Sequence, residues 1–299
     1  MTVTVTATEL ASARYKGLDC WENDDILTAI WEGQVRALSG VAGAVPDLSD
    51  AAAAIVRRLG DDRSRLAYAG AGSSGLLAMQ DAAELTPTFG WPTDRLVFLM
   101  AGGDAARLSP SATGEDDVAA AERDVADANI AATDVVIAVA ASGTTPYTVR
   151  LVEAAGRRGA LTVGLANNPD TPLLKRSDHP VLLISGPEVI AGSTRLGAGT
   201  AQKAALGMLS TLVMTRLGHV MDGHMVSVVA GNDKLRVRAV RMVGQIAAVS
   251  EDAAAAAVDA CDGDVKQAAL VAHGLTPGAA RAALDDSGGN LRLALETVA

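Results

Sequence analysis

The sequence has few aromatic residues and no block of basic residues. Phe, Trp and Tyr together make up 3% of its 299 residues, which argues against the stacking surfaces with which proteins bind single-stranded nucleic acid. The formal net charge is −10 at pH 7, and Lys and Arg are not gathered in any one stretch. Nucleic acid and anionic membranes are therefore poor partner hypotheses, although a local phosphate site is compatible with this charge.

Cysteines and long apolar runs are equally scarce. Cys20 and Cys261 are the only cysteines, and neither belongs to a CxxC or Cys/His pattern, so we expect neither a disulfide framework nor a zinc site. The first residues lack the basic and apolar regions of a signal peptide. The most apolar stretch, residues 204–213, is too short to span a bilayer. These absences predict a cytoplasmic protein without a membrane segment.

What the sequence does contain is a high proportion of apolar residues in short runs. Hydrophobic residues account for 49% of the chain, enough for a sizeable core. Runs typical of buried strands cover residues 65–69, 96–100, 135–140, 160–165 and 180–184. Helical patterns lie between them at residues 76–85, 115–128 and 147–157. This alternation predicts a three-layer α/β sandwich with a parallel sheet, in which ligands bind at the carboxyl ends of the strands.

Helical sequence flanks this α/β region on both sides. Residues 24–59 have a helical periodicity, and residues 199–217 have that of a long buried helix. Further on, residues 250–269 realign on residues 276–295, and each copy contains a Gly turn between two helical segments. We therefore expect an N-terminal helical segment, an α/β domain and a C-terminal helical module with an internal repeat, covering residues 1–60, 61–221 and 222–299.

Two strands of the predicted sheet lead into turns made of glycine and hydroxyl residues. The first turn is Gly70-Ala71-Gly72-Ser73-Ser74-Gly75, and the second is Ala141-Ser142-Gly143-Thr144-Thr145-Pro146. Each turn precedes a helical pattern, and backbone N–H groups and hydroxyls at a helix N-terminus form a site for an anion, usually a phosphate. Two such turns in one α/β unit predict a phosphorylated small molecule as the ligand.

Each turn also has a plainer explanation. The glycines at 70, 72 and 75 match the spacing of a dinucleotide-binding fingerprint, but the acidic residue that this fingerprint requires after the next strand is not evident. A tight strand–helix connection would need the same glycines without any ligand. In the second turn, helix capping accounts for one hydroxyl and not for three, so we favour anion binding there.

Two glutamates are candidates for proton transfer. Glu84 falls near the end of the helical pattern that follows the first turn, and Glu115 begins an acidic run. Taken alone, each is explained by a solvated surface carboxylate or by the preference of acidic residues for helix starts. The four histidines have no metal-ligand spacing, and neither a GxSxG nor a Walker lysine motif occurs, so hydrolase and kinase chemistry have little support.

In their order along the chain, these blocks resemble the N-acetylmuramic acid 6-phosphate etherase family, which has the sugar isomerase (SIS) fold and is related to the glucokinase regulatory protein. The resemblance runs over nearly the whole chain and is densest at residues 69–75, 81–84, 87–90 and 101–103. It continues at residues 115–117, 140–143, 145–147, 186–189, 192–196, 198–203, 232 and 234–236. It implies a SIS-type sandwich, a phosphosugar substrate, no cofactor and no metal. It also implies a homodimer whose site lies near the subunit interface.

By this resemblance, the protein cleaves the D-lactyl ether at C3 of N-acetylmuramic acid 6-phosphate in the recycling of cell-wall amino sugars. The products are N-acetylglucosamine 6-phosphate and D-lactate, formed by elimination and hydration. The family's two carboxylates fall on Glu84, as the acid toward lactate, and on Glu115, as the base at C2. Sugar or phosphate contacts are implied for Ser73, Ser74, Ser142, Gly143, Thr144 and Thr145, and further pocket-lining positions for Ser193, Thr194, Lys203 and Lys234.

The chain departs from the family at three cationic positions. Leu76 and Thr144 stand where the family has Arg, and Gly197 stands where it has Lys. Each lost cation removes a charge-assisted contact worth roughly 1.5–3 kcal/mol. Two alternatives therefore stay open. One is a non-catalytic phosphosugar-sensing regulatory protein, and the other is an aldose–ketose phosphosugar isomerase, which shares C2 proton abstraction but has no ether leaving group.

Overall fold

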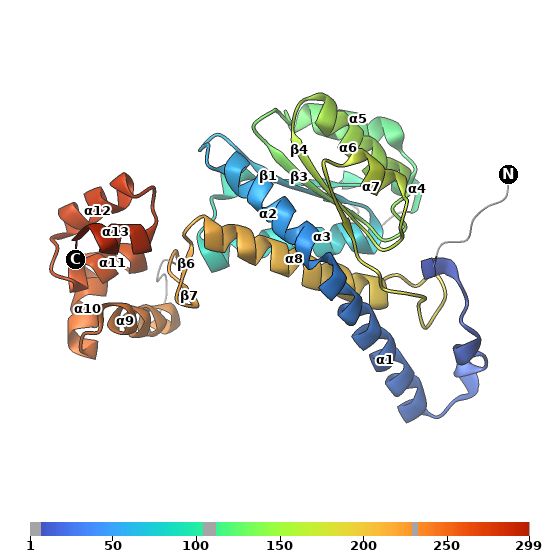
Figure 1. Cartoon of the computed structure of the whole chain (residues 1–299), viewed down its shortest axis with the longest axis horizontal. Helices are drawn as coiled ribbons and strands as arrows, with labels where there is room; N and C mark the ends of the chain where they lie inside the picture. Colours follow the sequence, from blue (N-terminus) through green and yellow to red (C-terminus); the bar gives the residue numbers. More distant parts are fainter. Residues whose placement is uncertain (1–6, 104–111, 229–232, 299) are drawn as a thin grey trace. The chain divides into compact units, whose positions relative to one another are not determined.

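A five-stranded parallel sheet organises the α/β region. The computed structural model describes residues 7–103, 112–228 and 233–298. The strands are β1 (Leu66–Gly70), β2 (Leu96–Met100), β3 (Val135–Ala140), β4 (Leu161–Ala166) and β5 (His179–Leu182). They follow the order β2-β1-β3-β4-β5. Figure 1 labels β1, β3 and β4 of this sheet. The strands predicted from apolar runs are confirmed, with small shifts at their ends.

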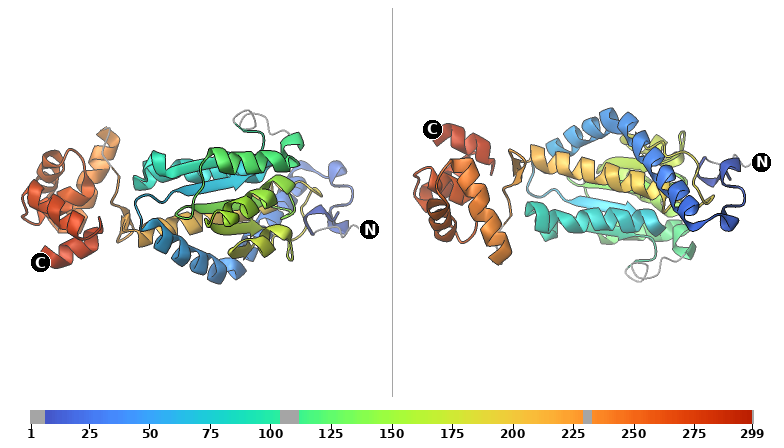
Figure 2. Two further views of the ribbon diagram at one scale, coloured as in Figure 1. Left: turned by 90° about the horizontal axis from the view of Figure 1, so that it is seen from above. Right: turned by 90° about the horizontal axis from the view of Figure 1, so that it is seen from below.

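Alternate side chains along each strand pack into different layers. Ala67 and Ala69 of β1 belong to the buried cluster formed with α5 (Val118–Asp127), α6 (Pro146–Arg157) and α7 (Pro172–Arg176). On the other face, the Tyr68 hydroxyl donates a hydrogen bond of 3.1 Å to Asp81 of α3 (Gly72–Phe89). The helices α2 (Val45–Leu59) and α8 (Gly197–Arg216) cover that same face (Figure 2). The predicted three-layer α/β sandwich is confirmed.

The helical pattern over residues 24–59 is confirmed, and the structure divides it into two helices. The helix α1 (Asn23–Val41) ends in the short 3-10 helix η4 (Ala42–Ala44), and α2 begins at Val45. Pro46 lies in the first turn of α2, where its missing N–H costs nothing; inside a continuous helix it would remove a hydrogen bond. Shorter 3-10 helices before α1 are η1 (Ala7–Glu9), η2 (Ala13–Tyr15) and η3 (Leu18–Cys20).

Two helices of the α/β region also differ from their predicted bounds. The helix α3 runs through residues 72–89 instead of 76–85. In place of one helix over residues 115–128, the chain forms α4 (Ala112–Glu115) and α5, and η5 (Thr93–Arg95) precedes β2. The Asp117 side chain accepts a hydrogen bond of 2.8 Å from the N–H of Ala120 and so starts α5 as a separate helix. This break leaves Glu115 at the end of α4.

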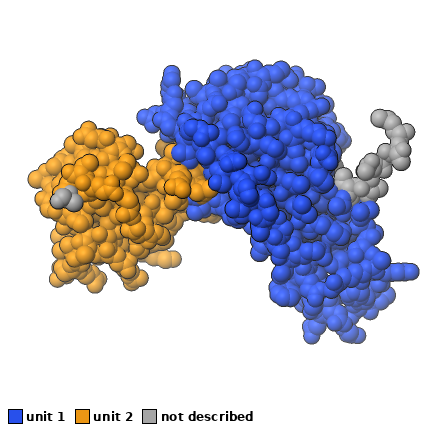
Figure 3. All heavy atoms as spheres, in the orientation of Figure 1, with its two compact units in different colours: residues 1–83, 93–211 blue, residues 84–92, 212–299 orange. Residues whose placement is uncertain are grey.

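The chain forms two compact units, residues 1–83 with 93–211 and residues 84–92 with 212–299 (Figure 3). The second unit contains the antiparallel pair β6 (Val220–Met221) and β7 (His224–Met225). Its helices are α9 (Asp233–Ala247), α10 (Glu251–Ala260), α11 (Val265–Ala272), α12 (Pro277–Asp286) and α13 (Leu291–Val298). Within the described ranges, no helix is both long and apolar enough to cross a bilayer.

The last four helices cover the two segments that the sequence predicts to be copies of a repeat. Ser250 caps α10 by accepting a 3.3 Å hydrogen bond from the N–H of Ala253, and its counterpart Thr276 caps α12 in the same way through Ala279, also at 3.3 Å. Between the paired helices, the counterparts Gly263 and Gly289 have left-handed φ values of 84° and 74°. One buried apolar cluster joins both copies to α9, so each copy covers the apolar face of the other.

Candidate active site

The order of the strands creates a crevice at the carboxyl ends of β1 and β3. The strand β1 pairs with β2 on one side and with β3 on the other. Connections that leave neighbouring parallel strands in opposite directions open a crevice between them, and ligands of such folds bind there. Gly70 at the end of β1 is in register with Val139 of β3. The two Gly/Ser turns therefore begin side by side at this crevice.

A pocket of about 470 Å³ lies between the two turns. Its lining residues are Glu9, Ala71, Gly72, Ser73, Ser74, Glu115, Ala140, Ala141, Ser142, Thr145 and Thr194. The pocket thus brings together several residues proposed from the sequence, namely Ser73, Ser74, Glu115, Ser142, Thr145 and Thr194. Hydroxyl groups, the first turn of α3 and the N-cap residue of α6 face the space, whereas the described lining residues include no Lys or Arg.

Close packing requires the glycines of the first turn. A Cβ on Gly70 would lie 2.8 Å from the Cα of Gly75 and 2.9 Å from the carbonyl oxygen of Val139. A Cβ on Gly72, which has a φ of +53°, would lie 2.7 Å from Oε1 of Glu115. The tight-connection explanation is therefore correct for these glycines. It does not explain Ser73 and Ser74, whose side chains line the pocket.

The second turn carries a hydroxyl that helix capping leaves unused. Thr145 is the N-cap residue of α6, but its side chain makes no capping hydrogen bond. Its Oγ1 instead lies 3.4 Å from Oγ of Ser142, which accepts a 3.1 Å hydrogen bond from the N–H of Thr144. Because the N-cap side chain does not occupy the N–H groups of the first helical turn, these donors stay available to an anion.

Buried polar residues that the sequence analysis missed support the second turn. The Nδ2 of Asn168 and the backbone N–H of Asn167 each donate a 3.0 Å hydrogen bond to the carbonyl of Ala141. Gly143 has a φ of +69°, and a Cβ there would lie 2.3 Å from Oγ1 of Thr171. Gly143 therefore shapes the turn through its backbone. The available signal was the pair of asparagines that directly follows an apolar strand.

Glu115 is the carboxylate most closely tied to the first turn. It ends α4, and its Oε1 fills the space over Gly72 where a side chain would otherwise project. Burial raises the pKa of the Glu115 carboxyl above its ordinary value, and the charge of Asp116 adds to this shift. A carboxylate with a raised pKa is a stronger base, which suits it to remove a proton from carbon.

Other residues proposed from the sequence do not line the pocket within the described residues: Gly143, Thr144, Ser193 and Lys203. The Nζ of Lys203 forms an ion pair with Oδ1 of Asp81 at 3.7 Å. Burial raises the pKa of Asp81, and Ser210, Lys203 and Tyr68 oppose this shift. Lys203 thus balances the negative charge of the buried Asp81 carboxylate.

Glu84 and Lys234 belong to the second unit. Glu84 is exposed on α3 before its last turn, because α3 continues to Phe89. Lys234 is exposed in the first turn of α9. Both side chains therefore reach solvent.

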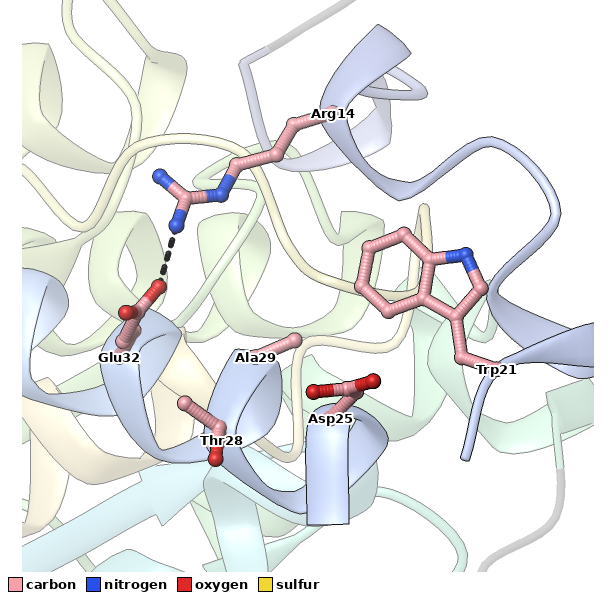
Figure 4. A pocket seen from close by; sticks show the side chains of 6 residues that line it. All are labelled: Arg14, Trp21, Asp25, Thr28, Ala29 and Glu32. Carbon is pink, nitrogen blue, oxygen red and sulfur yellow. Dashed lines mark hydrogen bonds and ion pairs between the residues drawn. The ribbon is translucent and has the colours of Figure 1, made fainter. Parts of the chain in front are cut away.

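A further pocket of about 430 Å³ lies on the N-terminal segment. Figure 4 shows its lining residues, Arg14, Trp21, Asp25, Thr28, Ala29 and Glu32. Arg14 forms an ion pair with Glu32 across this pocket, and its guanidinium also lies 6.0 Å from the ring centre of Tyr15. Because its cation is already neutralised, this pocket offers a phosphate little attraction.

Comparison with known proteins first defines the class. The family model of the SIS domain matches residues 116–212, and that of the glucokinase regulatory protein N-terminal SIS domain matches residues 47–155. A solved phosphoheptose isomerase from Francisella tularensis is 18% identical with a TM-score of 0.47, over 65% of this chain and 100% of that one. The matched domains, which include both turns and Glu115, make this a SIS-domain protein.

Two relatives then identify the family. An N-acetylmuramic acid 6-phosphate etherase from Deinococcus radiodurans is 49% identical over 96% of this chain and 94% of its own length. A protein of the same name from Streptomyces avermitilis is 43% identical over 86% of this chain and 83% of its own length. The chain belongs to the N-acetylmuramic acid 6-phosphate etherase family, which confirms the resemblance seen in the sequence.

Proposed function

We propose that this protein is an N-acetylmuramic acid 6-phosphate etherase, a carbon–oxygen lyase. It cleaves the D-lactyl ether and yields N-acetylglucosamine 6-phosphate and D-lactate. Identity of 38–49% with etherases over most of the chain supports this activity. The main structural support for this activity is that Glu115 and residues of both Gly/Ser turns line one pocket.

In the proposed mechanism, the open-chain aldehyde makes the C2 proton acidic. The Glu115 carboxylate takes that proton, and the resulting electron pair forms the C2–C3 double bond while the C3–O bond breaks. Glu84 protonates the departing ether oxygen, which leaves as D-lactate. Water then adds to C3 as hydroxide while its other proton passes to the Glu84 carboxylate, and Glu115, whose proton exchanges with solvent, returns a proton to C2. Burial of Glu115 supports the base role, because its raised pKa strengthens it toward a carbon acid; the acid role of Glu84 rests on the family motif.

We assign the 6-phosphate to the hydroxyls and N–H groups at the starts of α3 and α6. Ser73, Ser74, Ser142 and Thr145 support this assignment, because they line the pocket where those two helices begin. Thr194 is a further wall residue for the sugar. Gly143 and Thr144 would act through the shape of the second turn, whereas Ser193, Lys203 and Lys234 are proposed contacts from the family motif alone.

We also propose that the protein is a cytoplasmic homodimer. Support for a second copy comes from an exposed apolar row on α1, formed by Leu27, Trp31, Val35 and Leu38 with exposed fractions of 64%, 65%, 43% and 48%. Cys20 and Cys261 are free thiols, which suits a reducing compartment. Light scattering after gel filtration tests the dimer: the mass of one chain in solution would contradict it.

The test of the activity is incubation with N-acetylmuramic acid 6-phosphate in D₂O, followed by NMR and mass spectrometry of the products. We expect D-lactate together with N-acetylglucosamine 6-phosphate that carries deuterium at C2. Release of neither product by a protein that binds the substrate would contradict the etherase and favour the phosphosugar sensor. The residues Leu76, Thr144 and Gly197, which stand where the family has cations, motivate that alternative. A ketose product without lactate would instead indicate an isomerase.

A further inference from the structure

The residue in front of Glu9 is fixed by contacts to distant parts of the chain. Thr8, in η1, is fully buried. Its Oγ1 accepts a 3.1 Å hydrogen bond from Nδ2 of Asn168, and its carbonyl accepts one of 3.0 Å from the N–H of Gly192. The same Nδ2 of Asn168 holds the carbonyl of Ala141 in the second turn. The short N-terminal segment is thereby anchored to the base of the pocket.

The hydrogen bonds of Thr8 place the neighbouring Glu9 carboxylate at the pocket. Glu9 is exposed and lines the pocket together with Glu115. Its Oε2 lies 2.9 Å from the place that a Cβ on Gly192 would occupy, so the carboxylate rests against the Gly192 backbone. Among the described residues, no hydrogen bond or ion pair of the Glu9 side chain is found. Two carboxylates thus share one pocket without a lysine or arginine in its described lining.

Such an arrangement gives the Glu9 carboxylate no bonded partner among the described residues. The residue before it, by contrast, is held by hydrogen bonds to Asn168 and Gly192. A carboxylate without protein donors can still accept hydrogen bonds from a ligand that carries neutral hydroxyl or amide N–H groups. It also repels phosphate and carboxylate groups, which the helix starts in the same pocket attract.

We propose that Glu9 is a specificity-determining residue that accepts hydrogen bonds from the uncharged hydroxyl or acetamido N–H groups of the sugar. It thereby orients the ring so that the anionic substituents face the starts of α3 and α6. This inference rests on the proposed function for the identity of the ligand. Glu9 binds the ring and takes no part in proton transfer.

The experiment compares Glu9→Ala and Glu9→Gln with the wild type, and Glu22→Ala serves as the matched control. Glu22 is an exposed acid whose side chain makes no capping hydrogen bond at the start of α1. We expect Glu9→Ala to raise KM for lactate release about 10- to 100-fold, the worth of a hydrogen bond to a charged group, and kcat to change by less than about threefold. Glu9→Gln keeps one carbonyl acceptor and should raise KM less. The Glu22→Ala protein should match the wild type.

Inhibition by inorganic phosphate separates a ligand contact from a general distortion of the site. If Glu9 contacts only the sugar ring, the inhibition constant of phosphate stays the same or falls in Glu9→Ala. A KM within about twofold of the wild type in both variants would overturn the proposal. So would a fall in kcat at unchanged KM, or an equal weakening of phosphate and substrate.

Calorimetric binding of N-acetylglucosamine 6-phosphate distinguishes this inference from the etherase assignment. If the wild type binds this sugar phosphate without cleaving the ether substrate, the proposed function fails. The inference about Glu9 then stands if Glu9→Ala binds at least tenfold more weakly at an unchanged melting temperature. If the wild type does not bind the sugar phosphate, the inference fails as well.

Discussion

The two Gly/Ser turns follow neighbouring strands and reach the same pocket, but different interactions hold them in place. In the first turn, Gly70 and Gly75 approach too closely for any side chain. In the second turn, Asn167 and Asn168 hold the carbonyl of Ala141 by hydrogen bonds. Both turns are thus sensitive to added atoms, because a Cβ on Gly143 would also lie 2.3 Å from Oγ1 of Thr171, but the second turn depends on its polar partners as well. Similar sequence signals can therefore conceal different physical requirements.

The largest expected effect concerns Glu115, which packs against the first turn. Replacing Glu115 by Gln removes the proposed base and should lower kcat about 10²- to 10⁴-fold, the usual contribution of a general base. Initial rates of D-lactate release measure this loss, and thermal unfolding checks the fold. Asp127→Asn is the control, because that exposed acid at the end of α5 lies outside the pocket lining. Wild-type rates in the Glu115→Gln protein would exclude it as the base.

The next effect tests the steric basis of the first turn. Gly70→Ala places a methyl group 2.8 Å from the Cα of Gly75, and we expect a loss of about 2–3 kcal/mol in the free energy of unfolding. Urea denaturation measures it. The control is Gly156→Ala in α6, where a Cβ meets nothing within 4 Å, so stability should rise by about 0.5–1 kcal/mol. Equal stability of the two variants would remove the close-packing argument.

A smaller effect tests the polar support of the second turn. Asn168→Ala leaves the Thr8 hydroxyl without its 3.1 Å donor and removes one of two donors to the Ala141 carbonyl. We expect a loss of about 1–2 kcal/mol in unfolding free energy, together with a raised KM. Chemical denaturation and steady-state kinetics measure the two quantities. An unchanged KM would mean that the turn keeps its shape without the amide.

The smallest effect is a shift in pH dependence. The Asp116 charge contributes to the raised pKa of Glu115, so Asp116→Asn should lower that pKa. Because the proposed base must be ionised, kcat/KM falls as the pH drops through the pKa of Glu115. The acid limb of the pH–rate profile should therefore move to lower pH in Asp116→Asn. A movement to higher pH would contradict the electrostatic argument.

The sequence predicts features that depend on neighbouring residues, and it does not predict contacts between residues far apart in the chain. Strand positions and both turns follow from local sequence patterns. The sheet and the pocket residues Ser73, Ser74, Ser142 and Thr145 could therefore be predicted from the sequence. The helix break at Pro46 and the helix cap at Asp117 also depend on local sequence, but hydrophobic periodicity alone does not predict them. Thr8 and Asn168 are 160 residues apart, and no local pattern records their contact. Lys203 shows the same limit, because its partner Asp81 is known only once α3 and α8 are packed.

The shared amide of Asn168 has an evolutionary consequence. One Nδ2 group bonds both the hydroxyl of Thr8 and the carbonyl of Ala141, so the start of the chain and the second turn cannot diverge separately. A lineage that replaces Thr8 by a residue without a hydroxyl should also change Asn168, or else lose the order of both segments. Positions 8 and 168 are therefore expected to vary together among relatives that retain Glu9, and to vary freely in relatives that lack it.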